Sequence, residues 1–132
     1  MTVVIRESKE TQIRLAITAG TGVATVSTGD GFLDHMLVAF ARYAGVDLSV
    51  QATGDMRHHL IEDVAITLGQ AVAAFAPAGC ARYGERTVPM DDALVQVVLD
   101  IGGRPYYEGK LPSKLYEHSL RSFADNAKAT LH

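Results

Sequence analysis

Gly31-Phe-Leu-Asp-His-Met-Leu-Val-Ala-Phe-Ala-Arg-Tyr-Ala44 is the stretch whose pattern decides the fold. Its apolar residues recur every three or four positions, which places them on one face of a helix. These residues are Leu33, Met36, Leu37 and Phe40. We therefore predict a helix over residues 32–44, ended by Gly45. Asp34 and His35 are the polar residues within its first turns.

The pattern of this helix recurs 83 residues later along the chain. With that shift, Asp34 falls on Glu117 and His35 falls on His118. The apolar positions follow: Leu33 falls on Tyr116, Phe40 on Phe123, Ala44 on Ala127 and Leu48 on Leu131. Each half is therefore expected to contain strands, a helix with an acid–histidine pair, and a further strand. Helices also share such patterns by chance, which is the alternative explanation.

The predicted fold class is α+β, with a duplicated unit of strands in a sheet and helices packed on one face. We expect one domain over residues 1–132, with half-repeats over 1–79 and 80–132. The second copy stops where a strand begins, so we expect it to be incomplete, without its strand end and final helix.

The other elements follow from alternating or helical apolar spacing. Predicted strands cover residues 3–5, 13–17, 23–26, 46–50, 82–88, 93–101, 105–108 and 129–132. Two more helices are predicted over residues 58–75 and 113–128, the second with Ser113 as its N-cap. Their expected core faces are Ile61, Val64, Ala65, Leu68, Val72 and Phe75 in the first, and Tyr116, Leu120, Phe123 and Ala127 in the second.

Composition sets limits on the function. The chain has 132 residues, 48% of them hydrophobic and 20% charged, and a net charge of −3. That balance argues against a nucleic-acid partner, and no apolar run approaches the roughly 20 residues of a membrane span. The start of the chain has no signal-peptide pattern, and Cys80 is the only cysteine, so we expect a cytoplasmic protein.

The most informative segment for chemistry is His58-His-Leu-Ile-Glu-Asp63. On a helix, His58 and Glu62 are four apart and share a face, and His59 and Glu62 are three apart. The two histidines diverge by about 100°, so they would serve two metal ions or separate roles. Imidazole and carboxylate groups suit manganese, iron or zinc. The alternative is a solvated helix start with ordinary polar side chains.

Two further histidines strengthen the metal hypothesis. His35 alone would more often be a hydrogen-bonded structural residue, and His118 alone an ordinary residue of an amphipathic helix. Their equivalence under the 83-residue shift makes a pair of related ligands more credible, because a duplicated unit donates equivalent groups. His132 lies on a predicted strand and is interpreted as structural.

Arginines beside glycines are the candidates for binding an anion. Arg82 precedes Tyr-Gly, and Arg104 follows Gly102-Gly103. Glycine lets a ligand approach the backbone while guanidinium forks onto phosphate oxygens. A surface arginine in a turn is the alternative for each. Asp91 and Asp92 are interpreted as turn residues.

Taken together, several segments resemble the imidazoleglycerol-phosphate dehydratase family, in the family's order and over nearly the whole chain. The matching segments are residues 31–37, 54–55, 58–66, 68–69, 88–94, 99–100, 103–105 and 130–132. The resemblance implies two similar halves of the ribosomal protein S5 domain 2-like type. It also implies a hydro-lyase of histidine biosynthesis, which removes water from imidazole glycerol phosphate to give imidazole acetol phosphate.

The resemblance also implies roles for individual residues. The family uses a pair of Mn²⁺ ions at subunit interfaces, and the matching ligands are His35, His58, His59, Glu62 and His118. The catalytic carboxylates would be Glu10 and Glu62. The substrate would contact Glu10, His35, Arg82 and Arg104.

The chain departs from the family pattern at three places that matter. A second His-His-x-x-Glu segment of the family is not present in this sequence, and the stretch between Asp55 and His58 is about three residues short. The predicted helix after His35 carries Ala39 and Tyr43 where the family usually has a glutamine and a histidine. The alternative function is therefore a catalytically incomplete, metal-free oligomeric core of the same family. We expect a homo-oligomer, a trimer without metal and a 24-subunit shell with metal. An RNA-binding relative of the same fold is disfavoured by the acidic balance.

Overall fold

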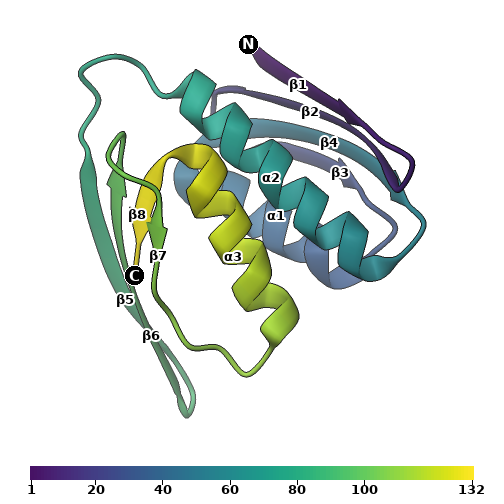
Figure 1. Cartoon of the computed structure of the whole chain (residues 1–132). Helices are drawn as coiled ribbons and strands as arrows, with labels where there is room; N and C mark the ends of the chain where they lie inside the picture. The colour runs from purple at the N-terminus through teal and green to yellow at the C-terminus, as the bar shows by residue number, and fades with distance from the viewer.

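Two four-stranded sheets and three helices make up this computed structural model, which describes all residues from 1 to 132 (Figure 1). The first sheet contains β1 (Thr2–Glu7), β2 (Thr11–Ala19), β3 (Ala24–Ser27) and β4 (Val46–Gly54). The second contains β5 (Tyr83–Met90), β6 (Ala93–Ile101), β7 (Tyr106–Tyr107) and β8 (Ala129–Leu131). The helices are α1 (Gly31–Ala44), α2 (Arg57–Phe75) and α3 (Lys114–Ala127). None of them is both long and apolar enough to cross a membrane.

The two sheets have the same topology, which confirms the predicted α+β fold with a duplicated unit. Their strand orders are β1-β2-β4-β3 and β5-β6-β8-β7, with two antiparallel pairings and one parallel pairing in each. The register agrees as well, because Ala24 pairs with Leu48 and Tyr107 pairs with Leu131, again 83 residues apart. Both ends of α1 fall on both ends of α3 with this shift.

The equivalent helices α1 and α3 also begin in the same way. Asp30 and Ser113 are their N-caps, and each side chain accepts a hydrogen bond from a backbone N–H of the first turn. The acids of the two acid–histidine pairs bind the preceding loop. Asp34 accepts from the N–H of Thr28, and Glu117 accepts from the N–H of Leu111. These acids therefore hold the loop against the helix.

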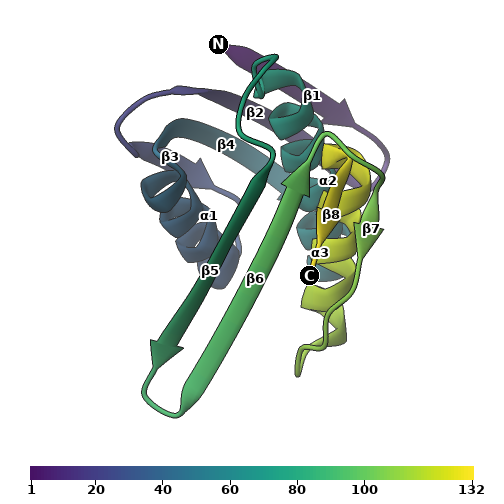
Figure 2. The same ribbon diagram turned by 90° about the vertical axis from the view of Figure 1, so that its left-hand side faces the viewer.

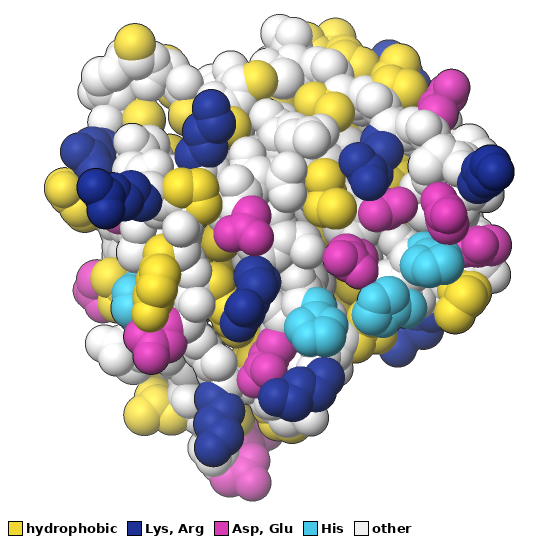
Figure 3. All heavy atoms as spheres, viewed as in Figure 1, with side chains coloured by type: hydrophobic (Ala, Val, Ile, Leu, Met, Phe, Trp, Pro, Cys, Tyr) yellow, Lys and Arg dark blue, Asp and Glu magenta, His cyan; other side chains and the backbone are white.

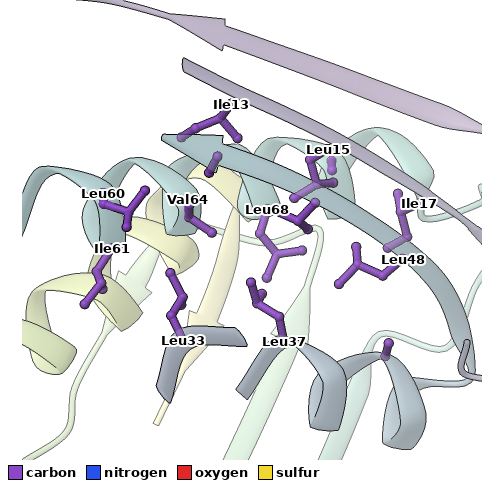
Figure 4. Close-up of a cluster of buried hydrophobic side chains, with 14 of the residues drawn as sticks. Ile13, Leu15, Ile17, Leu33, Leu37, Leu48, Leu60, Ile61, Val64 and Leu68 are labelled. Carbon is purple, nitrogen blue, oxygen red and sulfur yellow. The ribbon is translucent and has the colours of Figure 1, made fainter. Parts of the chain in front are cut away.

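The main core lies between the first sheet and helices α1 and α2, where large aliphatic side chains interdigitate (Figure 4). Its fully buried members include Leu15, Ile17, Ile61, Val50 and Val64. The predicted core faces are correct at most positions, with two exceptions. Met36 and Leu120 are 39% and 37% exposed. Val72, Phe75, Tyr116 and Phe123 are partly buried against the core.

The second sheet is covered less completely than the first. Helix α2 packs on β1, β2 and β4, whereas α3 packs on β7 and β8, and no helix packs extensively on β5 or β6. The register places Val95 and Val97 of β6 where β2 has Ile13 and Leu15. Val95 is 53% exposed, whereas Ile13 is 2% exposed. Figure 2 shows the β5–β6 ribbon extending away from the helices.

The two halves are joined chiefly where α2 crosses α3. Gly69 of α2 lies at this crossing, and a Cβ atom placed on it would lie 2.6 Å from the carbonyl oxygen of Phe123 and 2.9 Å from Cβ of Asn126. A glycine there lets the two helix backbones approach closely, and any larger side chain would force them apart.

We expect Gly69→Ala to destabilise the fold by about 1–3 kcal/mol, the usual cost of overpacking a well-packed contact. Urea denaturation measures the change. Gly31→Ala is the matched control, since Gly31 is also helical but a Cβ there meets nothing within 4 Å. A Gly69→Ala protein as stable as the Gly31→Ala protein would contradict close packing at the crossing.

One carboxylate organises the turn between β2 and β3. Asp47 of β4 accepts hydrogen bonds from the backbone N–H groups of Val23, Thr21 and Gly22 at 2.9–3.2 Å. These donors favour the ionised form, with Val23 contributing most, so the pKa of Asp47 is lowered. A lowered folded-state pKa means that ionised Asp47 stabilises the fold above the usual aspartate pKa. That contribution disappears as the pH falls through the lowered value.

We expect Asp47→Asn to be less stable than the original chain at neutral pH, and the difference to shrink as the pH falls through the lowered pKa of Asp47 and its carboxylate becomes protonated. Urea denaturation at neutral pH and at acidic pH measures this. Asp92→Asn, in the exposed β5–β6 turn, should show no such pH-dependent difference. If the difference in the free energy of unfolding between Asp47→Asn and the original chain is equally large at both pH values, the charge of Asp47 does not stabilise the fold.

Candidate metal and substrate site

The start of α2 brings a histidine and a carboxylate together. His58 Nε2 lies 3.1 Å from Glu62 Oε2, as the spacing of four residues predicts. Both side chains are partly exposed, at 49% and 38%, so the pair is accessible to an ion from solvent. Local sequence explains the placement, because Leu60, Ile61 and Val64 bury the opposite side of the helix.

The crossing of α2 and α3 brings a second histidine to the same surface. The ring centroids of His58 and His118 are 6.3 Å apart. Figure 3 shows histidine side chains gathered beside acidic ones on the face formed by these helices. His118 is exposed. Residues 60 positions apart in sequence thus line one surface.

His59 points away from His58 and has different partners. The two rings are nearly perpendicular, with centroids 6.2 Å apart. His59 Nδ1 lies 2.7 Å from Asp55 Oδ1, and this hydrogen bond raises the pKa of His59 and lowers that of Asp55. Glu10, in the turn between β1 and β2, adds negative charge near His59, and its carbonyl accepts from the N–H of Asp55 at 2.9 Å.

The structure does not bring every predicted site residue to this surface. His35 is exposed on α1, and no hydrogen bond, ion pair or ring contact joins it to His58, His59 or His118. His132 lies apart as well, where its ring stacks against Tyr106 at 5.5 Å. A single chain therefore forms two groups of predicted site residues. One contains His58, Glu62 and His118, and the other contains Glu10 and His59.

The two arginines lie together but far from the histidines. Arg82 makes two hydrogen bonds to Asp100, at 3.1 and 3.0 Å, which raise its pKa. Its guanidinium also lies against Gly103, next to Arg104, and it lines a hollow with Ala73 and Ala76 at the end of α2. The 19 residues of α2 span about 28 Å, so this corner and His58 lie at opposite ends of the helix.

Sequence reasoning missed two groups of contacts. The spacing of four between Asp55 and His59 could have revealed their pairing. The second group gave no such signal, because it joins three helices. Arg57 of α2 donates to Asp30 before α1 at 2.6 Å and lies over the ring of Tyr116 of α3. This cluster fixes the start of α2 near the start of α3, beside the histidines.

The donor set is suited to a divalent cation of intermediate softness. Imidazole nitrogens and a carboxylate are the groups that manganese, iron or zinc prefer. No group of three histidine, cysteine or acidic side chains within the chain is arranged to hold an ion. The residues fit such a metal by their chemistry.

Comparisons with known proteins identify the family of this chain. The family model for imidazoleglycerol-phosphate dehydratase matches residues 28–132. The dehydratases of Methanosarcina barkeri and Methanosarcina mazei are 46% and 48% identical over 96% of this chain and 75% of their own length. A crystal structure of the Pyrococcus furiosus enzyme is 40% identical, with a TM-score of 0.84, over 98% of this chain and 77% of that one.

These findings define the class first: the relatives are dehydratases, and the chain is a hydro-lyase by family. It belongs to the imidazoleglycerol-phosphate dehydratase family, which acts in histidine biosynthesis. The chain spans about three quarters of the length of the relatives it matches.

Proposed function

We propose that this protein catalyses the metal-dependent dehydration of imidazole glycerol phosphate to imidazole acetol phosphate in the cytoplasm. The observation that carries the proposal is the gathering of His58, Glu62 and His118 where α2 meets α3, in a chain of the dehydratase family. Each group is exposed enough to reach a substrate, and the imidazole ring of the substrate is itself a metal-binding group.

The metal in this proposal is Mn²⁺, two ions per site, held by His35, His58, His59, Glu62 and His118. Bound metal would act as a Lewis acid and stabilise negative charge on the substrate's ring. His58 and Glu62 supply adjacent donors from one helix face, and His59 supplies a donor in a different direction. Because His35 does not meet them within the chain, we propose that a second copy supplies it and that the active form is a homo-oligomer.

The remaining residues hold the substrate and move a proton. Glu10 is exposed beside His59, so its carboxylate is available to take the proton from the second side-chain carbon of the substrate, counted from the imidazole. The hydroxyl on the carbon next to the ring leaves with a proton as water, and the resulting enol becomes the ketone at the second carbon. Arg82 and Arg104 bind the phosphate, and glycine beside each allows close approach. Both lie far from Glu10 in one chain, so they act on the site of a neighbouring copy.

One observation favours a second candidate function. No group of three histidine, cysteine or acidic donors converges within the chain. A catalytically incomplete, metal-free oligomeric core of the same family would have this property. In that case the protein would associate, as a trimer, without binding Mn²⁺ tightly.

Loss of a residue that only hydrogen-bonds to a metal ligand weakens metal binding by about 10- to 100-fold. We expect His58→Ala and Glu62→Gln, which remove proposed ligands, to weaken Mn²⁺ binding by more than this. Both variants should lose dehydratase activity while keeping the helical circular dichroism of the original chain, because both side chains lie outside the core. Calorimetric Mn²⁺ titration and an assay of ketone formation measure the two effects.

His132→Ala is the matched control, an exposed histidine on the other sheet, and it should bind Mn²⁺ as the original chain does. Full activity in His58→Ala or Glu62→Gln would remove those residues from the mechanism. A folded original chain that binds no Mn²⁺ and forms no ketone would favour the metal-free core.

A further inference from the structure

We propose that Asp55 is a positioning residue for His59. The carboxylate of Asp55 holds the imidazole of His59 with Nδ1–H directed at it, so that Nε2 is the nitrogen presented to a cation. The inference rests on the proposed function for the cation, but the tautomer itself can be tested without one. It concerns a residue that the resemblance does not place in the site.

The carboxylate of Asp55 is fixed in place by its backbone. Its N–H donates to the carbonyl of Glu10 at 2.9 Å, which ties it to the turn between β1 and β2. Its side chain does not cap the helix, because the N-cap of α2 is Met56, which makes no side-chain capping bond. The Oδ1 atom instead meets His59 Nδ1 at 2.7 Å, a short, charge-assisted distance.

The chemistry of the two groups decides the tautomer. An ionised carboxylate only accepts hydrogen bonds, so the ring nitrogen that faces it must carry hydrogen. In neutral imidazole the other nitrogen, Nε2, then carries the free lone pair. A carboxylate behind a histidine also raises the basicity of the ligating nitrogen and fixes the ring orientation. Glu10 and Asp63 add further negative charge around His59.

The neighbouring His58 provides an internal contrast. Its Nε2, not its Nδ1, faces a carboxylate, that of Glu62 at 3.1 Å. By the same reasoning, neutral His58 in the metal-free protein carries hydrogen on Nε2. Two consecutive histidines therefore have opposite tautomers, and His59 is the one already arranged to offer Nε2. The short connection between β4 and α2 produces this difference, because it places Asp55 one helical turn before His59.

The tautomers can be read directly from long-range ¹H–¹⁵N correlation spectra of the metal-free protein labelled with ¹⁵N-histidine. The spectra are recorded at a pH high enough that the ring signals no longer change with pH. We expect His59 to show hydrogen on Nδ1 and His58 on Nε2. In Asp55→Ala, His59 should shift to a mixture of tautomers. Asp55→Asn keeps an acceptor oxygen and should retain part of the preference, and Asp92→Ala should change nothing. A merely structural role for Asp55 would leave the tautomer of His59 unmoved.

Mn²⁺ titration provides the second readout. We expect Asp55→Ala to bind Mn²⁺ about 10- to 100-fold more weakly than the original chain, with Asp55→Asn between them. Hydrogen on Nε2 of His59 in the original chain, or an unchanged tautomer in Asp55→Ala, would overturn the positioning role. If the tautomers are as expected but the original chain binds no Mn²⁺, the positioning role stands, and the proposed function is what fails.

Discussion

The close crossing of α2 and α3 is the contact on which the rest of the structure depends. Helix α2 belongs to the first half of the chain and α3 to the second, and each also covers part of its own sheet. The absence of a side chain at Gly69 lets the two backbones approach. The same crossing places His118 within reach of His58, so the packing that joins the halves also assembles the candidate site.

The helices and the duplicated topology could be predicted from the sequence because both depend on local periodicity. The 83-residue shift extends to hydrogen bonds that the sequence alignment alone did not show. Asp30 and Ser113 cap equivalent helices, and Asp34 and Glu117, which the alignment already pairs, both bind the preceding loop. Exposure was less predictable, because equivalent helix positions are covered differently in the two halves: Leu120 is 37% exposed, whereas its equivalent Leu37 is 4% exposed.

The candidate site was predictable only in part, for a physical reason. Spacing along one helix places His58 beside Glu62 and turns His59 away, and both follow from 3.6 residues per turn. Contacts between elements cannot be read in this way. The distance from Arg82 to the histidines depends on the length and direction of α2, and the cluster of Arg57, Asp30 and Tyr116 depends on how three helices meet.

No helix covers the inner face of the β5–β6 ribbon. The two halves therefore unfold with unequal cooperativity, although their topology is the same. In β2, backbone hydrogen bonds are shielded by Ile13 and Leu15 under α2, so breaking them requires the core to open. In β6, the corresponding Val95 and Val97 are 53% and 41% exposed, and a two-stranded ribbon without cover is held by little apolar burial. Amide hydrogens of this ribbon therefore exchange through local opening, at a free energy well below that of the whole fold.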